Sequence, residues 1–277
     1  MGREENALIY KDTEKLCKEH PVLVESIKNS LAGQEIHLTP APAAERRYDA
    51  PAKVIVSKKR SFEAASAYKD SKVCVHNFAS AANPGGGVKN GSSAQEEALC
   101  RCSTLMSCID TKECWNSFYY PHRNARDPLH NDDCIYTPSV TVFKSDTASP
   151  KLMAEKDWFN ADIITCAALN LREKPSNSMN PGDGDRQVKI TDAQLCELHQ
   201  KRLRQILNVA VQHGAEVIIL GAFGCGAFLN PPFVVAEAIS RVLPDYLHCF
   251  KTIEFAVYCS PRDDTNYKVF SRKIKQN

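Results

Sequence analysis

The chain has 277 residues, which is enough for one large domain or two small ones around a sizeable hydrophobic core. Its 35 Lys and Arg residues nearly balance its 33 Asp and Glu residues, so the net charge of +2 excludes a general attraction to polyanions. Any binding of a phosphate-rich ligand must therefore be local. We expect no membrane segment and no signal peptide, because no stretch is long and apolar enough for either.

Twelve cysteines are present without a C-x-x-C pair. We therefore expect reduced thiols in a cytoplasmic compartment, with neither disulfides nor a zinc site.

Helices and strands are expected to alternate along most of the chain. Two helices come first, over residues 13–20 and 22–31, because Pro21 interrupts the pattern. The expected strands are residues 36–38, 53–56, 73–76, 140–143, 162–166, 217–220 and 253–258. The expected helices between and after them are residues 61–68, 94–106, 192–213, 233–243 and 265–274. Residues 113–133 and 173–187 are expected to be irregular. This alternation favours a three-layer α/β/α sandwich.

Two helix ends carry clear local signals. Thr191 and Gln194 have the spacing of a capping box, and Gly214 is expected to end the same helix. Ser93 and Glu96 have the same spacing and are expected to cap the helix of residues 94–106.

The most informative motif is the triple glycine Gly85-Gly86-Gly87, which Gln95-Glu96-Glu97 follows after seven residues. Successive N–H groups in a glycine turn can bind an anion, with no Cβ to keep the ligand away. The triple glycine could instead be only a flexible loop, and Glu96 could be only a helix cap. Glu97 lies about 100° further round the helix than Glu96, so the two carboxylates must have different roles. The combination of the triple glycine and the two glutamates favours an acid pair beside a bound phosphate.

A second glycine loop strengthens this interpretation. Residues 216–220 form an apolar, β-branched run that leads into the glycine-rich residues 221–232, and a helix follows. A strand, a glycine turn and a helix in this order can hold a phosphate at the helix N-terminus. A tight strand-to-helix turn would explain one such loop, but seven of the twelve glycines lie in the two segments (85, 86, 87, 91, 221, 224 and 226). The loop matches neither a Walker motif nor a dinucleotide fingerprint.

The glycine–glutamate spacing resembles the signature of poly(ADP-ribose) glycohydrolases of the smaller bacterial type, which have a macrodomain fold. Further matching segments are residues 77–84, 136–143, 167–170 and 224–228, and the resemblance runs from about residue 10 to 270. It implies a mixed central sheet in a macrodomain-like catalytic domain over residues 36–277. Residues 1–35 are expected to form an N-terminal helical extension.

The resemblance also implies roles for individual residues. Glu97 is the expected catalytic acid and base, and Glu96 is expected to hold ribose hydroxyls. Phe228 is expected to pack against the distal ribose. The expected substrate-binding residues are Asn83, Gly85, Gly86, Gly87, Val88, Gln95, Gly224, Cys225, Gly226, Ala227 and Phe228. No metal and no cofactor are implied.

Cleavage of an O-glycosidic bond needs a proton on the leaving oxygen and stabilisation of an oxocarbenium-like transition state. A carboxyl group at a helix N-terminus is normally an anion. Burial and an adjacent diphosphate would both raise its pKa and make it usable as an acid.

We therefore expect hydrolysis of the ribose–ribose bonds of poly(ADP-ribose), from the chain terminus, with ADP-ribose as the product. Closure of the pocket beyond the distal ribose is expected from residues 173–187 or 260–277. The expected partners are poly(ADP-ribose) and ADP-ribosylated proteins, with no membrane and no sequence-specific nucleic acid. The alternatives are removal of single ADP-ribose groups from proteins and non-catalytic binding of ADP-ribose; the acid pair argues against the latter.

Other polar and aromatic residues have a structural and a functional interpretation. Asn77 and Asn170 could contact ribose, although Asn is also ordinary in turns. His76 ends an apolar strand and is expected in the core. The aromatic residues 115 and 118–120 could stack on adenine, or bury against the core.

Overall fold

The computed structural model describes residues 2–177 and 181–276, and over these residues the chain forms one mixed seven-stranded sheet. The strand order is β1-β4-β5-β3-β6-β7-β2. The bounds are β1 (Glu35–His37), β2 (Lys53–Ser57), β3 (Val73–Ala79), β4 (Cys134–Val142), β5 (Phe159–Ala167), β6 (Val217–Leu220) and β7 (Thr252–Ala256). The pairs β1·β4 and β4·β5 are antiparallel, and the pairs from β5 to β2 are parallel. The carboxyl ends of β5, β3, β6, β7 and β2 therefore share one edge of the sheet.

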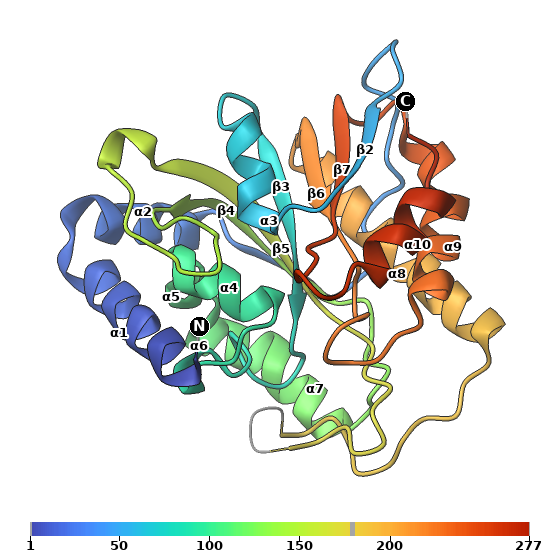
Figure 1. Ribbon diagram of the computed structural model, residues 1–277, viewed down its shortest axis with the longest axis horizontal. Coiled ribbons are helices and arrows are strands. Elements are labelled where there is room, and N and C mark those ends of the chain that lie inside the picture. The colour runs from blue at the N-terminus through green and yellow to red at the C-terminus, as the bar shows by residue number, and fades with distance from the viewer. Residues whose placement is uncertain (1, 178–180, 277) are drawn as a thin grey trace.

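Helices cover both faces of this sheet, which confirms the three-layer α/β/α architecture with a mixed sheet (Figure 1). The helices are α1 (Arg3–Glu19), α2 (Pro21–Ala32), α3 (Ser61–Ala65), α4 (Gln95–Cys102), α5 (Leu105–Ile109), α6 (Lys112–Cys114), α7 (Tyr120–Ala125), α8 (Asp192–Gln212), α9 (Pro232–Val242) and α10 (Thr265–Lys273). In Figure 1, α8, α9 and α10 gather on the right and α1, α2 and α4–α7 on the left.

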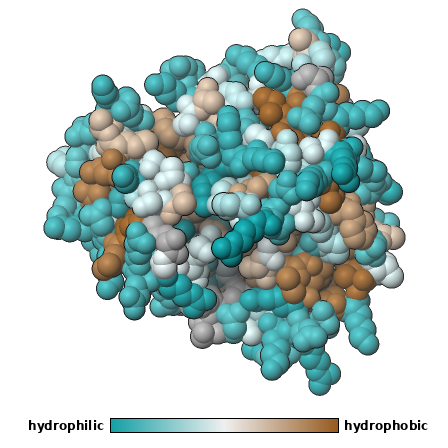
Figure 2. Space-filling model, in the orientation of Figure 1, coloured by the Kyte–Doolittle hydropathy of each residue, from teal (hydrophilic) through white to brown (hydrophobic). Residues whose placement is uncertain are grey.

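Each face of the sheet has its own hydrophobic core, because successive strand residues point to opposite faces. Ile164 and Ile218 pack in the core that contains residues of α8, α9 and α10. Their neighbours Ile163 and Ile219 pack in the core on the other face, with residues of α3, α4 and α5. On the molecular face shown in Figure 2, hydrophobic residues appear in separate patches among predominantly hydrophilic ones, as is ordinary for a globular protein.

The predicted helix over residues 94–106 is confirmed except for an interruption near its end. The structure has two helices, α4 and α5, separated at Ser103 and Thr104. Ser103 forms a β-bridge with Val142, and the Thr104 N–H donates to the carbonyl of Thr141 at 3.0 Å. Pairing with β4 therefore replaces the helical hydrogen bonds at this point, and the apolar spacing did not reveal it.

The prediction that residues 113–133 are irregular is wrong, because most of the first half is helical. The segment contains α6, a π-helical turn η3 (Trp115–Tyr119) and α7. The Thr111 hydroxyl accepts the Cys114 N–H at 3.2 Å and starts this helical stretch. Pro121 lies in the first turn of α7, where its missing N–H is not needed.

Strand β4 begins earlier than predicted, at Cys134 instead of residue 140. A bulge between Thr137 and Val140 accommodates Pro138 within this strand. Ser139 has φ +52 at this bulge, and its N–H donates to Asp162 at 2.9 Å. The other predicted strands are confirmed within one to three residues at each end.

The predicted break at Pro21 is confirmed, as is the capping box between Thr191 and Gln194. Helix α1 packs on α4, where the Thr13 hydroxyl donates to the carbonyl of Arg101 at 2.6 Å. The Asn6 amide donates to the carbonyl of Gly91, in the loop before α4, at 3.1 Å. Gly91 has φ +74, and a Cβ there would lie 1.8 Å from the Arg3 carbonyl oxygen. The division into residues 1–35 and 36–277 stays a prediction. Of the described helices, none is long and apolar enough to cross a membrane.

Candidate active site

Both glycine loops border one cavity of about 870 Å³ at the carboxyl ends of β3, β6 and β7. Of the residues predicted from the sequence, those that line this cavity are Gly86, Gly87, Gln95, Glu96, Glu97, Gly224, Gly226, Ala227 and Phe228. The predicted residues Asn83, Gly85, Val88 and Cys225 are not among its lining residues. The cavity therefore brings together most of the predicted site from three separate segments of the chain.

The two glutamates lie in the first turn of α4 and are both buried. The Oε2 atom of Glu96 accepts the Ser80 N–H at 2.9 Å, and its Oε1 atom accepts the Gly85 N–H at 3.2 Å. The Oε1 atom of Glu97 accepts the Gly87 N–H at 2.9 Å. Its Oε2 atom is buried at the cavity and has no hydrogen-bond partner among the described residues. Glu96 is thus held by the backbone on both oxygens, whereas one oxygen of Glu97 has no partner among the described residues.

The predicted capping box of Ser93 and Glu96 is wrong. Ala94 occupies the N-cap position of α4, and no side chain caps the helix. The carboxylate of Glu96 turns toward the end of β3 and the glycine loop instead. Gln95 fixes the same helix end, because its Oε1 atom accepts the Phe78 N–H at 2.9 Å and its amide donates to the His76 carbonyl at 2.8 Å. Gln95 therefore has a structural role at the cavity wall.

The electrostatics of the pair favour retention of a proton. Burial, and after it the neighbouring Glu97, raises the pKa of Glu96 well above its ordinary value. The N–H groups of Ser80 and Gly85 lower this pKa without offsetting the increase. The protonated form of the Glu96 carboxyl group is therefore favoured.

The triple glycine does not have the free N–H groups that the sequence interpretation expected. The N–H groups of Gly85 and Gly87 donate to the glutamates, and that of Gly86 donates to the Asn83 carbonyl at 3.0 Å. Gly86 has φ +54, and a Cβ on it would lie 2.6 Å from Oε1 of Glu97. This loop therefore fits tightly around the two carboxylates, and its N–H groups do not form the predicted phosphate cradle.

The second glycine loop differs from the first in the state of its backbone N–H groups. Within the described ranges, the N–H groups of Gly226, Ala227 and Phe228 donate to no other residue. A Cβ on Gly226 would meet nothing within 4 Å. Gly224 has φ +74, and a Cβ there would lie 2.5 Å from the Asn230 amide nitrogen. This amide stabilises the loop, because it donates to the Leu169 carbonyl at 2.7 Å. Three successive free N–H groups at a cavity are suited to bind an anion.

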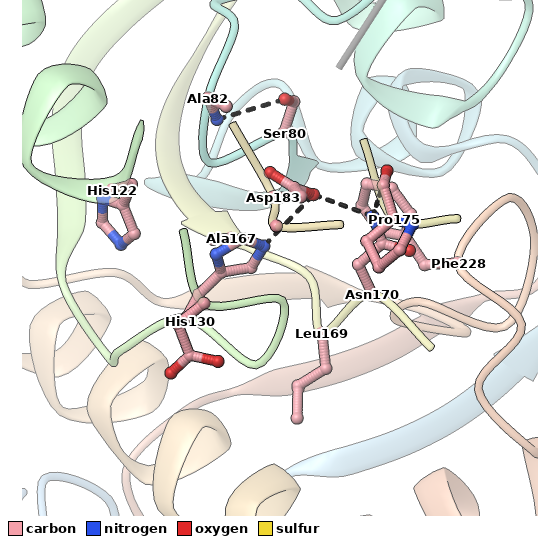
Figure 3. Close-up of polar contacts among 12 residues, drawn as sticks. Ser80, Ala82, His122, His130, Ala167, Leu169, Asn170, Pro175, Asp183 and Phe228 are labelled. Carbon is pink, nitrogen blue, oxygen red and sulfur yellow. Dashed lines mark hydrogen bonds and ion pairs between the residues drawn. The ribbon is translucent and has the colours of Figure 1, made fainter. Parts of the chain in front are cut away.

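A segment after β5 packs next to this loop (Figure 3). The Asn170 amide donates to the buried Asp183 at 2.8 Å and to the Pro175 carbonyl at 3.1 Å. Oδ2 of Asp183 also lies 3.5 Å from Nε2 of His130. These contacts fold the described parts of residues 173–187 back toward Phe228; residues 178–180 of this predicted loop lie outside the described residues. Arg172 lies over the Phe228 ring at 5.3 Å, and both line the cavity.

Several candidates from the sequence are buried within the fold. His76 packs between Phe78 and Phe223, and burial lowers its pKa to about 3. Asn77 and Asn170 are buried and hydrogen-bonded within the fold, outside the cavity lining. Burial raises the pKa of the Cys225 thiol to about 12, which excludes it as a nucleophile at neutral pH.

The aromatic segment at residues 115–120 does not line the cavity. Phe118 and Tyr119 are buried in a small core between η3 and the sheet, which favours the structural interpretation of this segment.

Other lining residues were missed. Tyr258 follows β7, and the Arg60 guanidinium lies over its ring at 3.9 Å. Arg3, Asn177 and Asn266 come from three distant segments. Nothing in their local sequence marks them, because only the fold brings them to the cavity.

The comparisons with known proteins agree with this geometry. The model of a family described as microbial-type PARG, catalytic domain, matches residues 6–145, which is half of the chain and includes the triple glycine and both glutamates. The search of curated proteins gave no match.

Among solved structures, the chain is similar to poly(ADP-ribose) glycohydrolase (PARG) from Thermomonospora curvata, with 26% identity, a TM-score of 0.83, and coverage of 98% of this chain and 100% of that chain. The same enzyme bound to the inhibitor ADP-HPD matches with 25% identity, a TM-score of 0.81 and the same coverage. PARG from Deinococcus radiodurans in complex with ADP-ribose matches with 26% identity and a TM-score of 0.74, over 89% of this chain and 96% of that chain. Since the family model matches half of the chain and the fold is shared over nearly its whole length, this chain belongs to the microbial-type poly(ADP-ribose) glycohydrolase family.

Proposed function

We propose that the protein hydrolyses the ribose–ribose O-glycosidic bonds of poly(ADP-ribose), with Glu97 as the catalytic acid and base. The observation that carries this proposal is that Glu97 lines the same cavity as Gly226, Ala227 and Phe228, whose N–H groups donate to no other described residue, and that its buried Oε2 atom has no partner among the described residues. An acid beside an anion-binding loop suits a substrate that carries a diphosphate next to the reacting ribose.

The loop over residues 224–228 binds the diphosphate through its N–H groups, and the ring of Phe228 orients the distal ribose. The Glu96 carboxyl group is fixed by two backbone N–H groups and holds ribose hydroxyls. Glu97 donates a proton through Oε2 to the leaving oxygen as the glycosidic bond breaks. It then takes a proton from the incoming water, which adds to the ribose carbon.

The raised pKa of Glu96 has a place in this mechanism. The raised pKa favours the protonated form of the Glu96 carboxyl group, and a diphosphate bound nearby adds negative charge that favours a protonated carboxyl group further. Substrate binding therefore helps to keep the acid protonated until the bond breaks.

We propose further that cleavage starts at the chain terminus and that ADP-ribosylated proteins carry the substrate. Support for terminal cleavage comes from Asn177 and Asn266, which belong to the two segments expected to close the pocket and which line the cavity. The twelve cysteines are free thiols, which supports a reducing, cytoplasmic compartment.

The test is to incubate the protein separately with poly(ADP-ribose) and with a mono-ADP-ribosylated protein, and to separate the products by length. The proposal expects ADP-ribose from the polymer from the earliest time points, with gradual shortening of long chains. Early release of oligomers would show internal cleavage. Release from the mono-modified protein alone would indicate the alternative hydrolase, and binding without release would indicate a non-catalytic module; either result would contradict the proposal.

A further inference from the structure

Three potential metal ligands converge at the β1 edge of the sheet, among residues that do not line the cavity. Glu35 and His37 lie two positions apart on β1 and therefore share a face of the strand. His213 follows the last residue of α8. The Nε2 atoms of the two histidines are 3.4 Å apart, and Oε2 of Glu35 lies 3.7 Å from His37 and 3.5 Å from His213.

These three distances form a nearly equilateral triangle. Ligand atoms at about 2.0–2.1 Å from a tetrahedral zinc ion lie about 3.3–3.4 Å from one another. A hydrogen-bonded chain of the same groups would have two short contacts and one long one, and no contact here is as short as an ordinary N–H···O bond. The triangle therefore fits coordination of one ion better than pairwise hydrogen bonding.

The surrounding residues hold this arrangement in place. The ring of Tyr136 stacks on His213 with centroids 3.6 Å apart and an angle of 8°. Tyr136 also pairs with Glu35 across the β1·β4 ladder, and its hydroxyl donates to Asp162 at 2.6 Å. Both histidine side chains are mostly buried, which restricts the positions that their rings can take.

We propose that Glu35, His37 and His213 form a zinc site that links β1 to the end of α8. Two histidines and one carboxylate are an established donor set for zinc, and the half-exposed Glu35 leaves the fourth position open to water. This proposal departs from the sequence analysis, which expected no metal site, because only the fold brings residues 35 and 213 together. The site joins the short edge strand, and with it α1 and α2, to the layer that contains α8.

The test uses the full chain after treatment with a chelator. Zinc is added in a calorimetric titration, and Co²⁺ serves as a spectroscopic probe of tetrahedral geometry. We expect one equivalent of zinc to bind, and the Tm to rise by about 5 °C at a zinc concentration of 100 times the Kd. Mg²⁺, which prefers six oxygen ligands, is expected to have no effect.

Three variants and a control assign the ligands. Glu35→Gln, His37→Gln and His213→Gln are each expected to weaken zinc binding by more than about tenfold. The control His248→Gln removes a histidine outside the cluster, which contacts the Tyr48 carbonyl, and is expected to bind zinc normally. Because Glu35 is half-exposed, its variant should fold even if a histidine variant does not. The proposal is overturned if zinc does not bind, or if it binds equally to the variants, as it would to the thiols.

Discussion

Glu97→Gln tests the assignment of the catalytic acid with little structural change. The Oε1 atom of Gln can still accept the Gly87 N–H that Glu97 accepts at 2.9 Å. The new amide nitrogen takes the place of Oε2, which has no partner among the described residues. Gln cannot donate and retake a proton, so hydrolysis of poly(ADP-ribose) should fall by about 10²–10⁴-fold. This loss corresponds to about 2.7–5.5 kcal/mol of transition-state stabilisation.

Folding and binding should be nearly unchanged in this variant. The substitution removes one of two adjacent buried carboxyl groups and keeps the backbone contact, so the Tm should not fall. The Kd for ADP-ribose, measured by calorimetry, should change less than about tenfold, because the loss concerns the transition state. Glu113→Gln, at an exposed position in α6 outside the cavity, is the matched control and should retain full activity. A Glu97→Gln enzyme with turnover near that of the control would refute the assignment.

Three further predictions concern the loops and the acid pair. Gly226→Val places its side chain in open space at the cavity, so the affinity for ADP-ribose should fall more than about tenfold while the Tm changes little. Unchanged affinity would exclude this loop from the site. Gly86→Ala puts a Cβ 2.6 Å from Oε1 of Glu97 at a residue with φ +54, and should lower the free energy of unfolding by about 1–3 kcal/mol together with activity. Because the folded-state pKa of Glu96 is raised, its stabilising contribution is complete below its unfolded pKa and is lost as the pH rises through the folded one. The Tm of Glu96→Gln should accordingly decline less between acidic and alkaline pH than that of the wild type; parallel curves would contradict the raised pKa.

Local signals in the sequence predicted the fold class and most element positions. The apolar run over residues 162–166, the break at Pro21 and the cap at Thr191 all depend on neighbouring residues. Two of the errors have a common cause in tertiary pairing. Ser103 interrupts a helix because Val142 pairs with it, and Pro138 fits into a strand because a bulge accommodates it.

The sequence predicted which residues lie at the candidate site more accurately than it predicted what each of them does there. The sequence predicted phosphate binding for both glycine loops, yet in the first one the N–H groups of Gly85 and Gly87 donate to the carboxylates. Which of two glycine loops keeps its N–H groups free depends on how α4 packs, and no local pattern encodes this. The same holds for Tyr258 and Asn266, which reach the cavity only through the arrangement of β7 and α10.

The central claim is that the loop over residues 224–228 binds the diphosphate while Glu97 faces the reacting ribose. A crystal structure of the Glu97→Gln variant with ADP-ribose tests it most directly. The account predicts diphosphate oxygens within about 3.2 Å of the N–H groups of Gly226, Ala227 and Phe228, with the distal ribose against residue 97. A diphosphate bound on the triple glycine, or ADP-ribose bound away from residue 97, would contradict the account.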